Sequence, residues 1–401
     1  KHSHVKLVLD NQVRRTFANA DVNSVIVLFS SPDDRREWAL DKTARFVMFR
    51  VPFEHILSPV IFDEIEEATE RKATKEYRVF PIQQSKLLED GCEIPEEEET
   101  GKAAGPLIKT THYTGNKWGG KYLRAPDIYW TILEKGKGKL VRLGDVVLVK
   151  YGIKTGANDF FYLNEDKVIE WGIEKEFLKP VIKSPRECKR IIIDPRDLKY
   201  KIFMCSKDKN ELKGTVALEY IKWGESQGFH ENESVKSRRF WWQSPDDKGN
   251  VFWGKEVRER IAAFCSEYQM YADCRLYLAN VSKWYQAVLN STFTAFLSEA
   301  MSRNLGGGGG PRSMMVYEVQ DLLTIKSDSA DDQATEIIST LFTRIGSMLL
   351  QPFVKDVNEP NRRSLDNVVF DTLGLTQGER DAVYEAVINL VEARLSKAGS
   401  V

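Results

Sequence analysis

The apolar positions of the first 91 residues follow the spacing of strands and of two helices. The β-branched run VNSVIVLFS, residues 22–30, predicts a buried strand, and ARFVMFRV, residues 44–51, predicts a second. Because only a polar stretch separates the two runs, a hairpin is their simplest connection. A helix is predicted after Pro59 within residues 55–73, and a short strand followed by a helix is predicted for residues 79–91.

The middle of the chain mixes short strands with helices. Short strands are predicted within residues 140–153, 159–163 and 190–194, and residues 314–325 return towards a strand. Helices are predicted at residues 207–225, 256–270 and 287–301. The five-glycine run 306–310 ends the last of these helices.

From Asp331 onward the pattern predicts helices only. Thr376 and Glu379 have the spacing of a capping box, and Gly399 stands where a helix C-cap belongs. Between them the apolar residues form one stripe, which consists of Ala382, Val383, Ala386, Val387, Leu390, Val391 and Leu395. Such a stripe predicts packing on the body of the protein; docking of a partner helix is the alternative.

Composition narrows the class of protein. Hydrophobic residues make up 42% of the 401 residues and charged residues 29%, which is typical of soluble globular proteins. No run approaches the roughly 18 apolar residues of a membrane span, and the polar start KHSHVKLVLDNQ does not resemble a signal peptide. The five scattered cysteines form no CxxC pair, which disfavours disulfides and structural zinc. We therefore expect a cytoplasmic protein without a membrane partner.

The net charge of −1 hides an uneven distribution. Residues 109–155 contain ten basic and three acidic residues, whereas residues 88–100 contain seven acidic residues and no basic one. A basic segment of this kind predicts contacts with phosphates. The alternative is a solvated, lysine-rich face without a ligand.

Within the basic segment, the stretch VKYGIKTGANDFFYL, residues 149–163, places a polar turn between two apolar runs. Gly152 and Gly156 permit a tight turn and a close approach of the backbone. Lys154 and Thr155 can meet a phosphate or a base, and the Asn158 amide offers both a donor and an acceptor. The alternative is a hairpin turn with ordinary polar residues.

Two segments of the chain match catalytic motifs only in part. GNKWGGKY, residues 115–122, nearly matches a phosphate-binding loop, but Tyr122 stands where Ser or Thr must ligate magnesium. Pro32-Asp33 and Asp41-Lys42 imitate a nuclease centre with the wrong spacing. A hydrolase with dispersed metal ligands therefore remains only as an alternative.

In order along the chain, several segments resemble the C-terminal part of N6-adenine DNA methyltransferases, especially the large type IIG restriction-modification enzymes. KLVLDNQVRRTFANADVNSVIVLF resembles the end of the catalytic domain, and NKWGGKYLRAPDIYWTIL with LGDVVLVKYGIKTGANDFFYL resembles the start of the target-recognition domain. The match continues through FLKPVIKSPRECKRIIID, RRFWW and AVLNSTFTAFLSEAMSRNLGGGG. Residues 365–398 look like the C-terminal extension of some members.

The resemblance implies an α+β protein with remnant strands of an α/β methyltransferase sheet, a mixed target-recognition domain and helical C-terminal elements. We expect the methyltransferase-like tail with its helical extension at residues 1–94 and an acidic linker or loop at 95–106. The target-recognition domain is then expected at 107–330 and a helical segment at 331–401.

The catalytic sequence motifs of that family are missing from this chain. Its chemistry needs an Asn/Asp-Pro-Pro-Tyr/Phe loop that holds a flipped adenine, and none of the 14 prolines is adjacent to another. A Phe-x-Gly-x-Gly-like turn for S-adenosylmethionine is also absent. Because the chain starts with Lys1 rather than Met, we expect a catalytic methyltransferase domain upstream in a longer parent. S-adenosylmethionine is then a cofactor of the parent, and this fragment holds no cofactor or metal.

The resemblance therefore implies sequence-specific recognition of double-stranded DNA for adenine-N6 methylation, within a restriction-modification or phage-defence enzyme. The alternatives are the hydrolase named above and a non-enzymatic interaction scaffold. Trp241 and Trp242 are either a stacking surface or part of the core. The residues expected to contact DNA are Lys117, Lys121, Arg124, Lys154, Thr155, Gly156, Asn158, Arg238, Arg239, Arg303 and Asn304.

Overall fold

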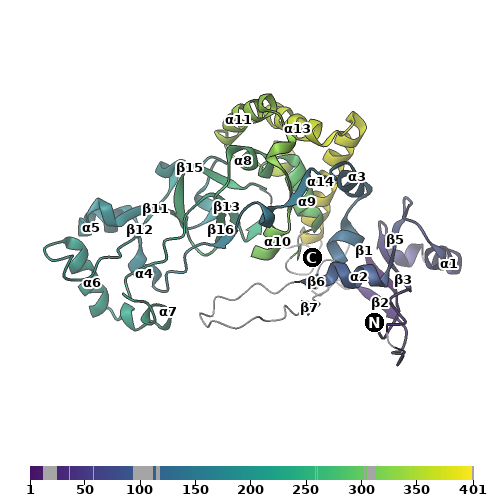
Figure 1. The fold of residues 1–401 in the computed structure, drawn as a ribbon, viewed down its shortest axis with the longest axis horizontal. Coiled ribbons are helices and arrows are strands. Elements are labelled where there is room, and N and C mark those ends of the chain that lie inside the picture. The colour runs from purple at the N-terminus through teal and green to yellow at the C-terminus, as the bar shows by residue number, and fades with distance from the viewer. Residues whose placement is uncertain are drawn as a thin grey trace. The chain divides into compact units, whose positions relative to one another are not determined.

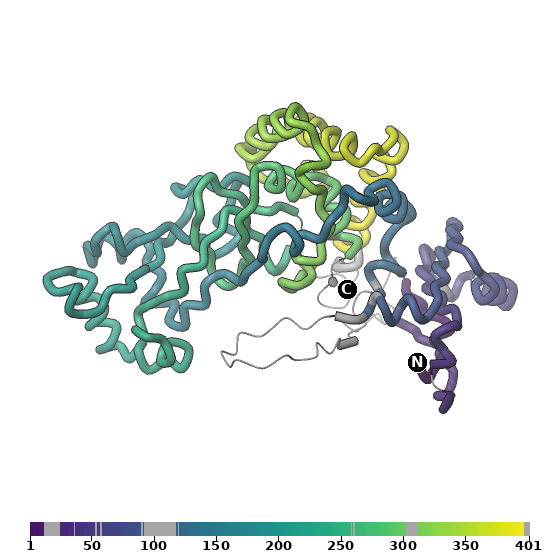
Figure 2. Tube along the Cα trace, viewed as in Figure 1, coloured from purple at the N-terminus to yellow at the C-terminus, as the bar shows by residue number. Residues whose placement is uncertain are grey.

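The chain divides into two compact units, drawn as a ribbon in Figure 1 and as a tube in Figure 2. The first unit consists of Lys1–Trp130, Ser298–Arg312 and Glu385–Val401, and the second of Thr131–Leu297 and Ser313–Tyr384. The division falls within the helices α3 (Asp127–Lys135), α9 (Thr292–Met301) and α14 (Gln377–Gly399). The computed structural model describes residues 1–11, 25–35, 37–56, 58–93, 112–113, 118–257, 259, 261–301, 303–304 and 312–399. The linker expected at residues 95–106 lies outside these ranges.

A five-stranded sheet, in the order β2-β1-β3-β5-β4, forms the centre of the first unit. β1 pairs in parallel with β3 and antiparallel with β2, and β5 is antiparallel to both of its neighbours. The strands are β1 (Val5–Asn11), β2 (Ile26–Phe29), β3 (Thr43–Phe49), β4 (Lys72–Ala73) and β5 (Tyr77–Gln83). Shorter elements of this unit are β6 (Cys92–Glu93), β7 (His112–Tyr113) and β17 (Arg303–Asn304).

Helical elements cover both faces of the central strands of this sheet. On one face, Leu7 of β1 belongs to a buried cluster with Ile65 of α1 (Pro59–Glu67). On the other face, Val8 belongs to a cluster with Leu87 of α2 (Gln84–Gly91) and Tyr122 of a π-helical turn (Gly119–Arg124). Because successive strand residues point to opposite faces, burial of both faces selects nearly continuous apolar runs.

Two expectations for the first unit are wrong. β2 and β3 form no hairpin, because β1 lies between them and pairs with both. The run 22–30 is also not a buried strand, since the side chains of Val25–Phe29 are between 36% and 65% exposed. The physical reason is position: β2 is an edge strand, and the described part of the chain pairs it with β1 alone.

A seven-stranded mixed sheet, in the order β10-β12-β11-β15-β13-β16-β9, forms the centre of the second unit. β11 and β15 are parallel, and the other neighbouring pairs are antiparallel. The strands are β9 (Lys150–Tyr151), β10 (Tyr162–Leu163), β11 (Leu178–Ile182), β12 (Tyr200–Phe203), β13 (Gly249–Gly254), β15 (Phe264–Ala272) and β16 (Leu276–Ala279). A separate ladder joins β8 (Leu140–Arg142) to β19 (Leu323–Ile325).

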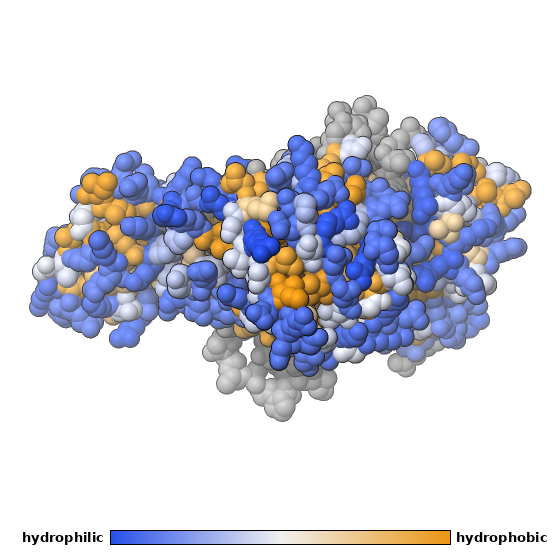
Figure 3. Space-filling view, turned by 90° about the horizontal axis from the view of Figure 1, so that it is seen from above, coloured by the Kyte–Doolittle hydropathy of each residue, from blue (hydrophilic) through white to orange (hydrophobic). Residues whose placement is uncertain are grey.

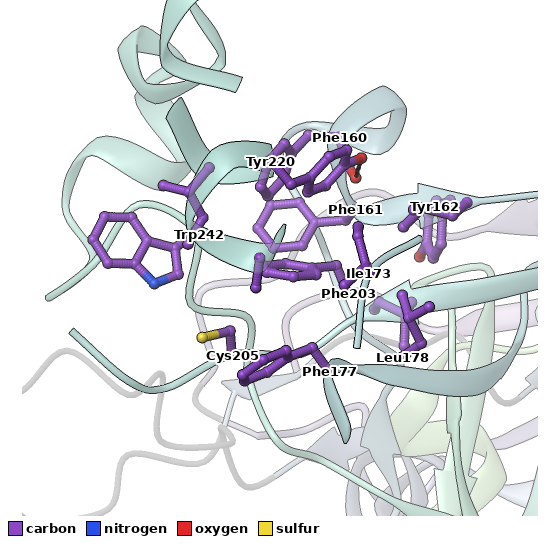
Figure 4. Close-up of a cluster of buried hydrophobic side chains, with 14 of the residues drawn as sticks. Phe160, Phe161, Tyr162, Ile173, Phe177, Leu178, Phe203, Cys205, Tyr220 and Trp242 are labelled. Carbon is purple, nitrogen blue, oxygen red and sulfur yellow. Dashed lines mark hydrogen bonds between the residues drawn. The ribbon is translucent and has the colours of Figure 1, made fainter. Parts of the chain in front are cut away.

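An aromatic core packs beside this sheet, and Figure 4 shows it at close range. The Phe160 ring stacks on Tyr220 of α6 (Val216–Ser226), with 4.8 Å between the ring centroids. Trp241 and Trp242 are 9% and 5% exposed, so both belong to the core and the stacking-surface alternative does not hold. Their indole N–H groups are satisfied internally, by the Glu225 carboxylate and the Lys207 carbonyl.

The predicted helix at residues 256–270 is wrong, because this segment holds β14 (Glu256–Val257) and most of β15. β15 lies inside the sheet between β11 and β13, and its two ends are buried. Packing in a central strand outweighs local propensity here.

Three other predicted short strands differ in part from the structure. Residues 159–163 combine the end of α4 (Asn158–Phe161) with β10, and residues 190–194 make only isolated bridges. Residues 314–325 contain α10 (Val316–Gln320) before β19. The remaining helices of the second unit up to residue 291 are α5 (Glu165–Trp171), α7 (Glu233–Lys236) and α8 (Lys283–Leu289).

The helical C-terminal region is confirmed. It contains α11 (Asp332–Gly346), α12 (Phe353–Asp356), α13 (Pro360–Leu373) and α14. At the start of α14 the Thr376 amide donates to the Glu379 carboxylate over 2.7 Å, as expected for one half of a capping box. Val383, Val387 and Val391 are fully buried, so the apolar stripe packs on the body of the protein as predicted.

The expected α+β class is therefore confirmed. The face drawn in Figure 3 is mainly hydrophilic, and hydrophobic residues gather there in only a few places. Within the described residues no helix is both long enough and apolar enough to span a bilayer.

Candidate functional site

The polar turn at residues 154–158 has a defined conformation. Gly156 has a φ of +77°, a left-handed conformation that glycine adopts without strain. Thr155 is 2% exposed, and its hydroxyl donates to the Asn158 side-chain oxygen over 2.5 Å. Asn158 opens α4, whose Phe160 and Phe161 enter the aromatic core. The turn is thus attached directly to the most densely aromatic part of the second unit.

A segment about eighty residues further along the chain holds this turn in place. The Arg238 guanidinium donates to the Lys154 carbonyl over 2.9 Å and to the Gln243 carbonyl over 3.1 Å. The Asn232 amide and the Ser234 hydroxyl both donate to the Gly156 carbonyl, over 3.0 and 3.4 Å. Partial burial lowers the pKa of Arg238. The anchors therefore fix the backbone path of the turn.

Three of the predicted side chains are exposed around this anchored turn, namely Lys154, Asn158 and Arg239, and we call them the turn surface. For Lys154, the described residues provide no ion-pair partner. The surroundings are not purely basic, because Asp159 and Glu233 are exposed nearby and Glu233 lies 3.7 Å from Lys236. The turn surface therefore offers two cationic side chains and an amide rather than a broad positive field.

The other predicted contact residues belong to the first unit. Lys121 and Arg124 lie partly buried in the π-helical turn of the first unit, and the Lys121 ammonium lies 5.4 Å from the Tyr122 ring centroid. Arg303 and Asn304 form β17. Lys117 lies outside the described residues.

Much of the charge in the basic segment is compensated by acids from distant parts of the chain. Lys135 pairs with Glu379 over 2.6 Å, Arg142 with Asp321 over 3.4 Å, and Lys150 with Asp247 over 2.8 Å. The Lys139 ammonium donates to the Thr372 carbonyl. Partly exposed pairs of this kind contribute little to stability, but they reduce the positive charge available to a ligand.

Sequence reasoning missed the supporting residues of the turn. Asn232 and Ser234 are polar residues in a short helical region, and no local signal marks them as partners of Gly156. Behind the turn, the Tyr162 hydroxyl donates to the buried Asp273 carboxylate over 2.7 Å. Burial, with that carboxylate adding to it, raises the pKa of the Tyr162 hydroxyl, which therefore stays a neutral donor. Tyr162 and Asp273 are structural supports that a single sequence does not reveal.

Residues 115–343 match the family described as the C-terminal domain of type II methyltransferase M.Eco57I. The chain belongs to this family. The match covers more than half of the 401 residues and includes the whole 154–158 turn with its anchors. The expected resemblance is thereby confirmed at the level of the type II methyltransferase C-terminal domain.

The solved structure of BpuSI has a fold similar to that of this M.Eco57I C-terminal-domain family member. The type IIG restriction endonuclease BpuSI superposes with a TM-score of 0.53 at 12% identity, over 99% of this chain and 44% of BpuSI. The type IIL restriction-modification enzyme MmeI in complex with DNA gives a TM-score of 0.42 at 12% identity, over 88% of this chain and 50% of MmeI. This chain thus spans less than half the length of BpuSI. A search of curated proteins found no match.

Proposed function

We propose that this chain is the DNA-reading part of a restriction-modification enzyme that methylates adenine at N6, with the catalytic core elsewhere in a longer parent. The observation that carries the proposal is the anchored 154–158 turn, which presents Lys154 and Asn158 from a rigid backbone. Membership of a type II methyltransferase C-terminal family supports DNA as the ligand. The acidic residues near the turn, Asp159 and Glu233, limit the general electrostatic attraction of this surface for DNA.

We expect the side chains of the turn surface to have different roles on a DNA duplex. Phosphate contacts position a protein, whereas hydrogen bonds to base edges read the sequence. Lys154 supplies a mobile cation for a phosphate. Asn158 keeps its amide donors and a second lone pair on its oxygen after accepting from Thr155, so it can bond an adenine edge in two places. Thr155, Gly156 and Arg238 act in this proposal by holding the turn rather than by touching DNA.

S-adenosylmethionine belongs to the parent in this proposal, because the residues present do not fit it. Gly136 and Gly138 form the connection from α3 to β8, and a glycine turn that seats this cofactor must instead follow a strand. The other glycine run, 306–310, lies outside the described residues. Held by the parent, the cofactor would supply the methyl group.

We therefore expect this chain alone to show no stoichiometric S-adenosylmethionine binding. Isothermal titration calorimetry checks this directly. Micromolar binding with a stoichiometry near one would contradict the expectation and reveal a cofactor site in the chain.

The alternative functions have no observation in their favour. Among the residues that the structure describes, no three His, Cys, Asp or Glu side chains gather as a metal-binding group. A scaffold without a nucleic-acid ligand would bind no DNA even at low salt, which the following experiment also tests.

Substitutions in the turn should separate phosphate contact from base reading. We expect the chain alone to bind duplex DNA with little sequence preference. A plot of log affinity against log salt concentration should be linear, with a negative slope of about 0.9 per phosphate contact. Lys154→Ala should weaken binding to all sequences and lower that slope by about one. In the full-length parent, which reads its cognate site, Asn158→Ala should cost about 1–3 kcal/mol on that site and little on other sequences. Fluorescence anisotropy with cognate and scrambled duplexes measures both effects.

Two further variants complete this experiment. Gly156→Val should impair binding to all sequences and lower stability, because a Cβ at Gly156 would lie 2.3 Å from the Ser234 hydroxyl oxygen at a φ of +77°. Lys137→Ala, at an exposed lysine of the same basic segment outside the turn, is the control and should leave base discrimination unchanged. If both alanine variants in the turn bind normally and only Gly156→Val loses stability, the turn is structural and the proposal fails.

A further inference from the structure

The strand β15 contains a bulge in the interior of the second unit's sheet. β13 and β15 pair Gly249 with Met270 and Val251 with Cys265. Between these two pairs β13 has one residue, whereas β15 has four. Three consecutive exposed residues lie in this insertion, although the three residues of β15 on either side of them are buried. We call them the β15 bulge, and they are Glu267, Tyr268 and Gln269.

Backbone hydrogen bonds hold the β15 bulge at both ends. Before it, the Cys265 amide donates to the Ile191 carbonyl over 2.8 Å. After it, Tyr271 is paired with the strand β11. At its start, the buried Ser266 hydroxyl accepts from the Tyr268 amide over 3.2 Å. Because bulges redirect side chains and are frequent next to functional sites, the three exposed side chains of this bulge are candidates for ligand contact.

The side chains of the β15 bulge keep their hydrogen-bonding groups available. Tyr268 is 72% exposed. Within the part of the chain that the structure describes, the side chains of Glu267, Tyr268 and Gln269 make no hydrogen bond or ion pair. The glutamate carboxylate is an acceptor, whereas the glutamine amide and the tyrosine hydroxyl can both donate and accept. Since the bulge carries a negative charge and no cation, it is not suited to bind phosphates.

The β15 bulge lies on the same strand that holds the start of the 154–158 turn. The Ile153 amide donates to the Ala272 carbonyl over 2.7 Å, at the end of β15. Tyr268 precedes Ala272 by four residues, which corresponds to at most about 13 Å along a strand. Successive base pairs are about 3.4 Å apart along a duplex, so this separation corresponds to about four base pairs. A duplex of ordinary site length can therefore span both the turn surface and the bulge.

We propose that the β15 bulge is a second base-reading element of this chain, in which Glu267 and Gln269 bond base edges in the major groove. The proposal rests on the proposed function, which supplies duplex DNA as the ligand. A glutamine amide can bond adenine at N6 and N7, and a glutamate carboxylate can accept from the amino group of cytosine. The bulge then contributes discrimination between sequences, while cations elsewhere contribute the general affinity for DNA.

A protein partner fits the β15 bulge less well than base edges do. The centre of a protein–protein interface is usually apolar and depleted in charged residues. In the bulge only the Tyr268 ring offers an apolar surface, because the flanking Ser266 and Met270 are buried. Base edges, in contrast, are recognised by polar side chains with free donors and acceptors, which are the groups that the bulge exposes.

Gln269→Ala in the full-length parent tests base reading by the amide. We expect the preference for the cognate duplex over duplexes with one changed base pair to fall by about 5- to 150-fold, which is the range for one bidentate base contact. The slope of log affinity against log salt concentration should stay the same, because no phosphate contact is lost. Fluorescence anisotropy with cognate, singly changed and scrambled duplexes measures both quantities. Gln333→Ala, at an exposed position of α11, is the matched control.

Glu267→Gln gives an independent test with an effect in the opposite direction. Removal of a negative charge beside the duplex should raise the affinity of the parent and of this chain for scrambled DNA by about two- to fivefold. In the parent, the same variant should lower the preference for the cognate duplex. Glu336→Gln, at an exposed position of α11, is the matched control and should change neither quantity. Thermal melting should show shifts below about 2 °C for all four variants, since each position is exposed.

Two results would overturn the inference. Unchanged affinity and unchanged sequence preference of both bulge variants would mean that the bulge does not touch DNA. An equal loss of affinity for all duplexes by Gln269→Ala, with a lower salt slope, would identify a phosphate contact instead of base reading. Failure of the proposed function looks different, because the unmodified parent and this chain would then bind no duplex DNA even at low salt. A parent that responds to Lys154→Ala but to neither bulge variant refutes only the present inference.

Discussion

Glu299→Gln is expected to destabilise the first unit by about 3–5 kcal/mol, the usual cost of removing one partner from a buried ion pair. The Glu299 carboxylate on α9 receives two hydrogen bonds from Arg394 on α14, over 3.1 and 3.0 Å. Arg312 lies 3.6 Å from the same carboxylate, and burial lowers the pKa of its guanidinium. All three side chains are at most 5% exposed. The glutamine keeps the shape of the side chain but removes the negative charge that the Arg394 and Arg312 guanidinium groups share.

Urea denaturation followed by circular dichroism measures this loss. Glu392→Gln, at an exposed position of α14 two residues before Arg394, is the control and should change the unfolding free energy by less than about 0.5 kcal/mol. If Glu299→Gln unfolds at the same urea concentration as the unmodified chain, the ion pair does not hold α9 to α14.

Gly152→Ala is expected to cost about 3 kcal/mol, at the upper end of overpacking effects. A Cβ on Gly152 would lie 2.2 Å from the Asp273 carbonyl oxygen and 2.6 Å from that of Ala272, and both are backbone atoms. The Asp273 segment cannot easily give way, because its amide donates to the Ile182 carbonyl. The neighbouring Ile153 amide also donates to the Ala272 carbonyl over 2.7 Å. The new methyl group therefore has to displace a hydrogen-bonded strand connection.

Two other glycines provide matched controls for Gly152→Ala. Gly172 has a φ of +63° and open space around it. Gly172→Ala should therefore cost only the free energy of placing a non-glycine residue in the left-handed conformation, about 1–2 kcal/mol. Gly378 in α14 has ordinary φ and open space, so Gly378→Ala should be neutral or stabilising by up to about 1 kcal/mol. Thermal melting should rank the three variants in this order. A melting temperature of Gly152→Ala above that of Gly172→Ala would contradict the argument.

Local patterns predicted the elements whose structure is decided locally. The helix α14 follows from its apolar stripe and from the Thr376–Glu379 cap, and β3 and β5 follow from their apolar runs. Connections over distance were not predictable in this way. The hairpin expected between β2 and β3 fails because the parallel partner of β3, the strand β1, precedes both in the sequence.

The candidate site shows the same limit. Lys154 and Asn158 stand out in the sequence because a polar turn interrupts two apolar runs. The roles of Arg238, Asn232 and Ser234 depend on contacts across 76 to 84 positions of sequence, which a single chain does not reveal. The charge count of residues 109–155 overstated the free positive charge for a related reason, since Glu379 and Asp321 approach only in the folded chain.

The anchors of the 154–158 turn have a consequence for how new DNA specificities could arise. Arg238 bonds the carbonyl of Lys154, and Asn232 and Ser234 bond the carbonyl of Gly156, so each of these grips a main-chain atom. Every amino acid at position 154 supplies the same carbonyl, so the identity of this exposed side chain is uncoupled from the path of the backbone. Asn158 is more constrained, because its side-chain oxygen accepts from the buried Thr155 hydroxyl. Position 154 can therefore be diversified, by evolution or in a library, on a support that stays unchanged.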